Sequence, residues 1–163
     1  MYLLSPTKEH ENLYIDMMLE WEQSKENINP SVIKRTMNYY KWLDMLEIYR
    51  ESKTCPPKLV PSNTYFLIND YKLLGAINIR HYLNDYLFQF GGHIGYGIRP
   101  SERKKGYATK LLHLALIKCR DLGIKKVLIT CEKDNIGSSK TIIANNGVLE
   151  NDIVNQSNKI IQR

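Results

Sequence analysis

One segment constrains the fold more than any other, because a strand pattern, a basic glycine turn and a helix pattern follow one another without a break. Apolar and small residues alternate from Phe90 to Ile98, at the period of two that a β-strand requires. The basic run Arg103–Lys105 and Gly106 come next, and residues 105–122 repeat apolar positions at helical spacing up to Gly123, a typical helix end. The sequence therefore predicts a long helix that begins at a cationic turn directly after a strand.

The turn before this helix has the chemistry of an anion site. The first backbone N–H groups of a helix lack internal partners, and the helix dipole adds partial positive charge there. Arg103, Lys104 and Lys105 add full charges, and Gly106 lets a ligand approach the backbone without a Cβ in the way. The segment therefore predicts a site for a phosphate or pyrophosphate.

The patterns before this segment indicate two helices and a hairpin. Apolar spacing predicts a helix over 9–24 and a second helix that is capped by Ser31, runs through positions 34–36 and reaches Leu46. Strand patterns over 64–68 and 73–79, joined by a turn at Asn69-Asp70, predict a hairpin.

The patterns after the anion turn continue the alternation of strands and helices. The expected strand over 88–98, helix over 105–122 and buried strand over 127–131 form a right-handed βαβ unit. A shorter helix is expected over 135–145, and residues 148–154 and those from Lys159 onward can form two further strands. With 163 residues and no internal repeat, residues 1–163 are expected to form one domain, whose last strand is either truncated or short.

Amino-acid composition limits the classes of ligand and partner that the chain is expected to bind. The formal charge of +6 suits a polyanionic ligand, but the Lys and Arg residues are scattered, which favours solvated surface and argues against nucleic-acid binding. Three cysteines without CxxC spacing indicate free thiols in a reducing cytoplasm, with neither a disulfide framework nor a metal site. We also expect no membrane span and no signal peptide.

Two motifs carry a family resemblance. The run Arg103–Ala108 resembles the pyrophosphate-binding signature (Gln/Arg)-x-x-Gly-x-(Gly/Ala) of the GNAT superfamily of acyl-CoA N-acyltransferases. Asp134–Ser138 is similar to the Asn-x-x-Ser motif that often follows a later strand of that family. The resemblance covers residues 59–150, and Gly91–Arg103 is similar to a bacterial subgroup described as predicted acetyltransferases.

The resemblance implies an α+β (mixed α/β) fold. Its central sheet is mixed and mostly antiparallel, with one splayed parallel strand pair joined by the βαβ crossover and helices on both faces. It also implies an N-acetyltransferase that moves an acetyl group from acetyl-CoA to a primary amine by direct attack in a ternary complex, without a metal. The acceptor would be a small-molecule or peptide amine, and family members are often homodimers. The alternative is a catalytically silent acyl-CoA-binding or regulatory module on the same fold.

The resemblance also implies which residues hold the cofactor. Those at the end of the strand and in the anion turn would meet the pantetheine arm and the phosphates, and those around the later helix would meet the rest. They are Ile98, Arg103, Lys104, Lys105, Gly106, Tyr107, Ala108, Thr109, Asn135, Ser138 and Lys140. Asn135 has a second interpretation as the N-cap of the helix that follows it, and the two roles can coexist.

The glycine-rich strand before the turn is expected to meet the ligand. Alternation places Gly91, His93, Gly95 and Gly97 on one face, a shallow slot open to a ligand, although a tightly packed strand is the alternative. His93 is the leading candidate for the general base or the anchor of a water relay, since imidazole titrates near neutral pH. A packed histidine is the other interpretation.

Two further points concern the acid and base. Glu102, Tyr96 and Tyr86 are further candidates for the base. Many family members place a tyrosine seven residues after the Asn, as the acid that protonates the leaving thiolate, and Ile142 stands at that position here. The chain therefore uses water, lacks a dedicated acid or takes one from elsewhere, for which His81 and Tyr82 at the end of the hairpin are candidates.

Overall fold

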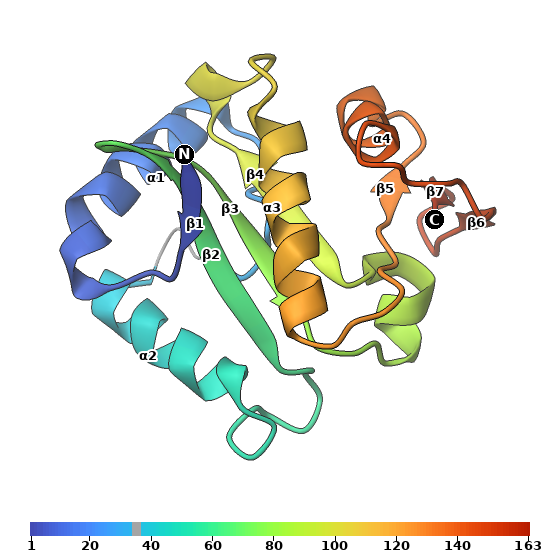
Figure 1. Ribbon diagram of the computed structural model, residues 1–163, viewed down its shortest axis with the longest axis horizontal. Helices are drawn as coiled ribbons and strands as arrows, with labels where there is room; N and C mark the ends of the chain where they lie inside the picture. The colour runs from blue at the N-terminus through green and yellow to red at the C-terminus, as the bar shows by residue number, and fades with distance from the viewer. Residues whose placement is uncertain (34–36) are drawn as a thin grey trace.

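A computed structural model of the chain describes residues 1–33 and 37–163, which form two β-sheets with helices packed around them (Figure 1). The first sheet has the order β1-β2-β3-β4 and contains β1 (Tyr2–Leu4), β2 (Ser62–Asn69), β3 (Lys72–Arg80) and β4 (Ile94–Ile98). The second has the order β5-β7-β6 and contains β5 (Cys131–Glu132), β6 (Asp152–Val154) and β7 (Ile160–Gln162). Neighbouring strands in both sheets are antiparallel.

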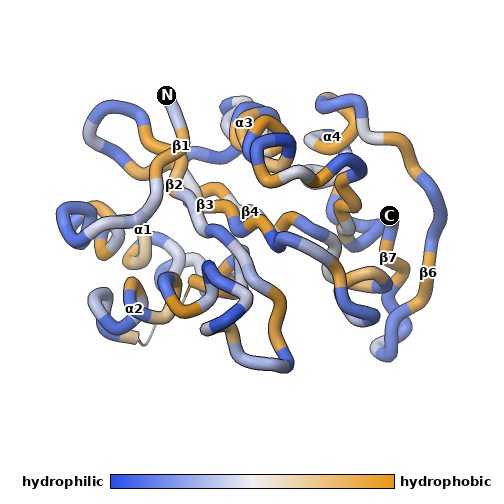
Figure 2. The backbone as a smooth tube through the Cα atoms, turned by 60° about the horizontal axis from the view of Figure 1, so that its bottom comes forward, coloured by the Kyte–Doolittle hydropathy of each residue, from blue (hydrophilic) through white to orange (hydrophobic). Residues whose placement is uncertain are grey.

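The helices lie on both faces of the first sheet (Figure 2). Two helices, α1 (Glu11–Ser24) and α2 (Tyr39–Arg50), cover one face, and α3 (Tyr107–Asp121) covers the other. The last helix, α4 (Ile136–Ile143), lies beside the second sheet. Short helical turns are η1 (Lys8–His10), η2 (Leu87–Gly91) and η3 (Pro100–Glu102).

Each face of the first sheet has its own apolar core. On the α1–α2 side, aromatic rings dominate, and Trp42 stacks on Phe66 with ring centroids 5.8 Å apart. On the α3 side, aliphatic residues of α3 such as Leu111 and Leu112 pack against β3 and β4. This two-sided burial explains why β3 is apolar almost throughout.

Most predicted helices are confirmed, with one correction. The first helix, the helix after the anion turn and the helix after Asn135 are α1, α3 and α4. The second begins later than predicted, because Ser31 lies in a turn and Asn38 is the cap, where its Oδ1 accepts from the N–H groups of Tyr40 and Lys41. Positions 34–36 of the predicted helix lie outside the described residues.

The predicted hairpin is confirmed as β2 and β3, but three predicted strands are shorter than expected, among them the one over 148–154, of which only Asp152–Val154 form β6. Residues 87–91 form the turn η2 instead of the start of β4, because Gly92 adopts φ +61° and its N–H donates to the carbonyl of Leu87 at 2.6 Å. Of the strand predicted over 127–131, only Cys131 belongs to β5.

The α+β fold class is confirmed, but the predicted parallel pair within one mixed sheet does not form among the described residues, because the two strands of the βαβ unit diverge fully. β4 and β5 belong to different sheets, and α3 connects them in sequence. The sheets are joined just before β4, where the N–H of His93 donates to the carbonyl of Leu128 at 2.8 Å. Beyond this junction β4 continues toward the anion turn, and α4 lies on the opposite side of the divergence (Figure 1).

Candidate functional site

The end of β4 is anchored to α1 by a buried ion-pair cluster. Arg99 is 1% exposed and pairs with Asp16 at 2.9 Å and with Glu20. Glu20 also accepts from the backbone N–H and the hydroxyl of Ser101, at 3.2 and 3.0 Å. Burial opposes ionisation of Glu20, but the hydrogen bonds from Arg99 and Ser101 outweigh it and lower its pKa to about 2. The cluster therefore fixes the backbone that leads into the anion turn.

The anion turn presents backbone donors. Lys104 and Gly106 have φ values of +60° and +81°, so the chain turns sharply between η3 and α3. The first bond of α3 runs from the N–H of Lys110 to the carbonyl of Gly106 at 3.2 Å. The N–H groups of residues 107–109 precede this bond and have no partner within the helix. Lys104, Lys105 and Gly106 are exposed, so a ligand can reach the turn from solvent.

The side-chain charges of the turn are mostly paired within the chain. Arg103 pairs with Glu26 at 2.6 Å and donates to the carbonyl of Ile98 at 3.1 Å. Lys105 pairs with Glu102 at 2.9 Å.

A second lysine shares the same carboxylate. Lys72, from the start of β3, pairs with Glu102 at 2.6 Å, and hydrogen bonds from Lys72 and Lys105 lower the pKa of Glu102. Lys104 forms no ion pair with any residue that the structure describes. The attraction for an anion therefore rests on the backbone donors and Lys104 more than on three free cations.

The glycine face of β4 is packed by the chain itself. A Cβ on Gly97 would overlap the carbonyl oxygen of Asn29, and a Cβ on Gly95 would lie 3.4 Å from Pro30. The predicted alternation of faces is confirmed, because Ile94, Tyr96 and Ile98 face the α3 core. The prediction of an open slot on the glycine face is wrong, because the segment after α1 occupies it.

His93 lies at the junction of the two sheets with one ring nitrogen occupied. Its Nδ1 is 3.0 Å from the N–H of Leu128, which donates to it, while its own N–H donates to the carbonyl of Leu128. Burial lowers the pKa of His93, so the neutral ring is favoured. With Nδ1 accepting, the proton of the neutral ring lies on Nε2. His93 can therefore donate from Nε2 but has no free nitrogen to accept a proton.

Gly92 allows the backbone before β4 to approach the backbone of Leu128 closely. A Cβ on Gly92 would lie 2.7 Å from the carbonyl oxygen of Leu128, and its φ of +61° is unfavourable for other residues. The neighbouring Arg80 adds to the junction, because its Nη1 donates to the carbonyls of Gly91 and Gly92 at 2.9 Å each.

A hydroxyl cluster bridges β4 and α4. The Tyr96 hydroxyl is 2.8 Å from the Ser138 hydroxyl, and the buried Thr141 lies near enough to influence the pKa of Tyr96. Burial raises the pKa of Tyr96, and it also raises the pKa of the Cys131 thiol beside the cluster. This contact joins the two sides of the divergence between β4 and β5.

Asn135 caps α4, as one of its two interpretations predicts. Its Oδ1 accepts from the N–H of Ser138 at 3.0 Å, and the side chain is exposed. The Nδ2 group of Asn135 makes no hydrogen bond with the residues that the structure describes. Lys140 is exposed on α4, and the Nδ2 of Asn145 donates to the carbonyl of Thr109 at 3.2 Å, which ties α4 to the first turn of α3.

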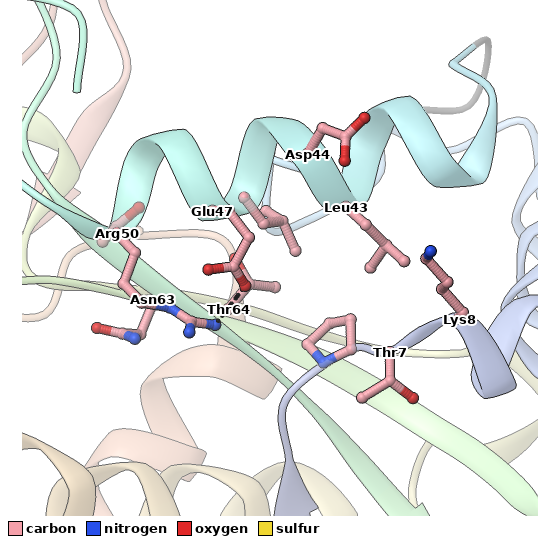
Figure 3. A pocket seen from close by; sticks show the side chains of 11 residues that line it. Thr7, Lys8, Leu43, Asp44, Glu47, Arg50, Asn63 and Thr64 are labelled. Atoms are coloured by element: carbon pink, nitrogen blue, oxygen red, sulfur yellow. Dashed lines mark ion pairs between the residues drawn. The ribbon is translucent and has the colours of Figure 1, made fainter. Parts of the chain in front are cut away.

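Two hollows lie away from the anion turn. The first, of about 270 Å³, lies between α2 and β2, where Figure 3 shows Asp44, Glu47 and Arg50 on the helix. The second, of about 570 Å³, lies between α3 and the segment that follows α4. Neither lining includes the anion turn, His93 or Tyr96.

The residues predicted to hold the cofactor fall into two groups in space. Ile98 and residues 103–109 surround the start of α3, while Asn135, Ser138 and Lys140 lie on α4 across the divergence. The orphan donors of residues 107–109 and the unpaired Lys104 fit a pyrophosphate, and the Nδ2 group of Asn135 fits an amide carbonyl. The described helices include none long and apolar enough to cross a bilayer.

The comparisons with known proteins agree with this geometry. The sequence model of the acetyltransferase (GNAT) family matches residues 16–141. No curated protein sequence matches the chain. A mutant of the spermidine N-acetyltransferase SpeG from Vibrio cholerae has the same fold, with a TM-score of 0.66 and 12% identity over 99% of this chain and 92% of that one.

Two other solved structures share the fold. The microcin C7 self-immunity acetyltransferase MccE, in complex with acetyl-CoA and AMP, has a TM-score of 0.66 and 16% identity over 98% of this chain and 89% of that one. The ribosomal L7/L12 α-N-protein acetyltransferase RimL, in complex with coenzyme A, has a TM-score of 0.67 and 12% identity over 98% of this chain and 90% of that one.

Proposed function

The chain belongs to the acetyltransferase (GNAT) family, and from that premise we propose that it transfers the acetyl group of acetyl-CoA to a primary amine by direct attack in a ternary complex. The observation that carries this proposal is the exposed turn at the start of α3, with its orphan N–H groups and Lys104. Acetyl-CoA supplies the activated acyl group, and the chain supplies position and polarisation.

Each part of the site has a proposed task. The N–H groups of residues 104–109 hold the pyrophosphate, together with Lys104 and with Lys105 if it leaves Glu102. Arg103 shapes the turn from within, since its side chain bonds to Glu26 and to the carbonyl of Ile98. Asn135, Ser138 and Lys140 contact the cofactor from α4, with Asn135 donating from Nδ2 while its Oδ1 caps the helix.

His93 is proposed as the anchor of a water molecule that takes the proton of the attacking amine. The N–H of Leu128 occupies Nδ1, so a direct role as base would require that bond to break. The Nε2–H can instead donate to a water, which then accepts from the amine.

The donor assignment is tested by coenzyme A binding with two matched glycine variants. Gly106 and Gly123 lie at opposite ends of α3, both with positive φ and with no atom within 4 Å of an added Cβ. Valine at either position therefore costs similar backbone strain, but only Gly106 adjoins the anion turn. We expect coenzyme A to raise the melting temperature of the wild type and of Gly123→Val, and Gly106→Val to lose the shift. No shift in the wild type overturns the donor assignment.

The His93 task is tested by comparing alanine with asparagine. An asparagine side chain at this position can accept from the N–H of Leu128 but lacks Nε2–H, so His93→Asn separates packing from chemistry. We expect both variants to slow transfer by about 10- to 10⁴-fold and to bind coenzyme A normally. A normal rate in His93→Asn would assign His93 to the junction alone.

The acceptor is proposed to be a primary amine on a small molecule or a peptide. Among proteins of the same fold, one is named for spermidine and another for the α-amino group of a ribosomal protein. A panel of polyamines, amino acids and peptide N-termini, assayed for release of free thiol, tests this class. Cytoplasmic location and a homodimer are also proposed, and light scattering tests the latter.

A catalytically silent acyl-CoA-binding module is the second candidate. The observation that favours it is Ile142, an apolar residue where the family often has a tyrosine. Coenzyme A binding without transfer to any amine of the panel would support this candidate over the enzyme.

A further inference from the structure

We propose that the hydroxyl of Tyr96, held by Ser138, donates the proton that the leaving thiolate of coenzyme A requires. This inference rests on the proposed function and assigns a residue to a step that it leaves open. The observation behind it is the hydroxyl cluster that joins β4 to α4.

The position of Tyr96 along β4 places it beside the path of the cofactor arm. Phosphates at the turn before α3 put the arm along β4, toward the junction at His93. Tyr96 lies two residues before Ile98 and three after His93, or roughly 7 and 10 Å at 3.3 Å per residue. The residue therefore lies between the phosphate end and the junction.

The direction of the side chain brings its hydroxyl into the divergence. Tyr96 shares a strand face with Ile94 and Ile98, and its hydroxyl reaches Ser138 on the first turn of α4 at 2.8 Å. An arm that separates β4 from α4 must pass this contact. The sulfur at the end of the arm then meets a phenol hydroxyl, which is a proton donor.

The surroundings keep this hydroxyl protonated. Burial raises the pKa of Tyr96, so the phenol holds its proton at neutral pH. Ser138 and Thr141 both come from α4, and Thr141 is 6% exposed. The Ser138 hydroxyl, 2.8 Å away, can pass a proton back to Tyr96 after Tyr96 has donated one.

Ile142 cannot supply this proton, and its side chain turns elsewhere. It packs against Gly147 and lines the hollow between α3 and the segment after α4. Thr141 takes the inward position next to Tyr96. The proposed proton donor therefore lies on β4 and not on α4.

The proton balance of the step is closed. The amine nitrogen forms a bond to the acetyl carbon, the carbon–sulfur bond breaks, and the thiolate takes the proton of the Tyr96 hydroxyl. The proton lost by the amine, carried by water, returns to Tyr96 through Ser138. No external acid or base is consumed overall.

The first test measures binding instead of turnover. A hydroxyl that donates to the sulfur stabilises the thiolate, so it lowers the pKa of the thiol in bound coenzyme A. Loss of a hydrogen bond to a charged group should raise that pKa by about one unit or more in Tyr96→Phe. The ultraviolet absorbance of the thiolate, titrated with the protein in excess, measures it. An unchanged thiol pKa overturns the proposal.

The second test measures turnover with a matched control. Tyr65 is a half-buried tyrosine on β2 whose pKa burial also raises, and it lies outside the site. We expect Tyr96→Phe to lower kcat by about 10²-fold with unchanged coenzyme A affinity. Ser138→Ala should lower kcat less, and Tyr65→Phe should leave it unchanged.

The outcomes separate this inference from the function on which it rests. A wild type that neither binds coenzyme A nor acetylates any amine contradicts the proposed function. An active Tyr96→Phe with the wild-type rate contradicts the proton donor alone. Tighter coenzyme A binding by Tyr96→Phe at an unchanged rate would instead make the Tyr96–Ser138 contact a bridge that closes the cofactor path.

Discussion

The two sheets of the molecule differ in how they are stabilised. The first lobe, β1–β4 with α1–α3, has an apolar core on each face of its sheet. In the second lobe, β5–β7 with α4, the strands have two or three residues, and Ile161 is the one apolar side chain of these described elements that is buried. Val148, after α4, is 87% exposed.

This difference means that one lobe supplies most of the stability of the fold, while both lobes supply residues proposed to contact the ligand. The first lobe contributes the strand, the turn and the helix N-terminus that would bind phosphate, on a rigid base. The second lobe contributes Asn135, Ser138 and Thr141 from a region with few buried contacts, and such regions open at low free-energy cost. We therefore expect a bound cofactor to order the second lobe.

The largest expected effect comes from truncating the core of the first lobe. Phe66 is fully buried between Trp42 and Tyr14, so Phe66→Ala should cost about 3–5 kcal/mol in the free energy of unfolding. Ile161→Ala should leave that global value nearly unchanged and raise hydrogen exchange in residues 131–163. Denaturant unfolding with exchange mass spectrometry measures both. Equal global losses would show that the lobes unfold as one unit.

Coenzyme A should reduce the difference in hydrogen-exchange protection between the two lobes. At about 100 times its dissociation constant it should add roughly 2.7 kcal/mol to the free energy of unfolding. Its slowing of hydrogen exchange should be greater in α4 and β5 than in β2 and β3, which are already protected. If coenzyme A slowed hydrogen exchange only in the turn before α3, the cofactor would not order the second lobe.

The two asparagine caps allow a smaller comparison. Asn38 caps α2 and Asn135 caps α4 by the same side-chain contact to backbone N–H groups, so alanine at either should lower the stability of its own helix by about 1 kcal/mol. Aspartate should restore both caps. Asn135→Asp should still raise the acetyl-CoA requirement, because it loses Nδ2 and brings negative charge toward the cofactor.

Steady-state kinetics beside thermal unfolding test this pair. Asn38→Asp is the control, since α2 lies on the opposite face of the first sheet from α3 (Figure 2). A stable Asn135→Asp variant with normal acetyl-CoA kinetics would limit Asn135 to capping.

Acid should weaken the anchor between α1 and the anion turn. The pKa of Glu20 falls from 4.5 to about 2 on folding, so its contribution to stability is present above pH 4.5 and is lost as the pH falls toward 2. Glu20→Gln should flatten this part of the stability profile. Asp152→Asn, which removes an exposed ion pair with Lys133 in the second lobe, should change it less. A stability profile unaltered by Glu20→Gln would show that the ion pair of Arg99 with Asp16 holds the anchor without Glu20.

Local chemistry made much of the first lobe predictable. Alternating apolar residues around Asn69-Asp70 indicate the hairpin, and helical spacing from Tyr107 to Cys119 indicates α3. The anion turn was predictable because orphan N–H groups follow from any helix start. The cap at Asn135 follows from the residue type and its place before a helix.

Other features depend on contacts between segments far apart in sequence. The short β4 and β5 reflect the positive φ of Gly92 and the junction of His93 with Leu128, which no local pattern reveals. The turn around Asn29 occupies the glycine face, and acidic residues of α1 and the following turn neutralise Arg99 and Arg103.

The sequence by itself determined the place of the anion turn, because short-range periodicity and helix ends reveal it, and two short motifs carried the family resemblance that implied the fold class. Tertiary structure alone decided which charges stay free, which nitrogen of His93 can act and where the hydroxyl of Tyr96 lies. Those properties depend on partners more than 30 residues away in the chain, such as Leu128 for His93 and Ser138 for Tyr96, and local patterns carry no information about such pairs.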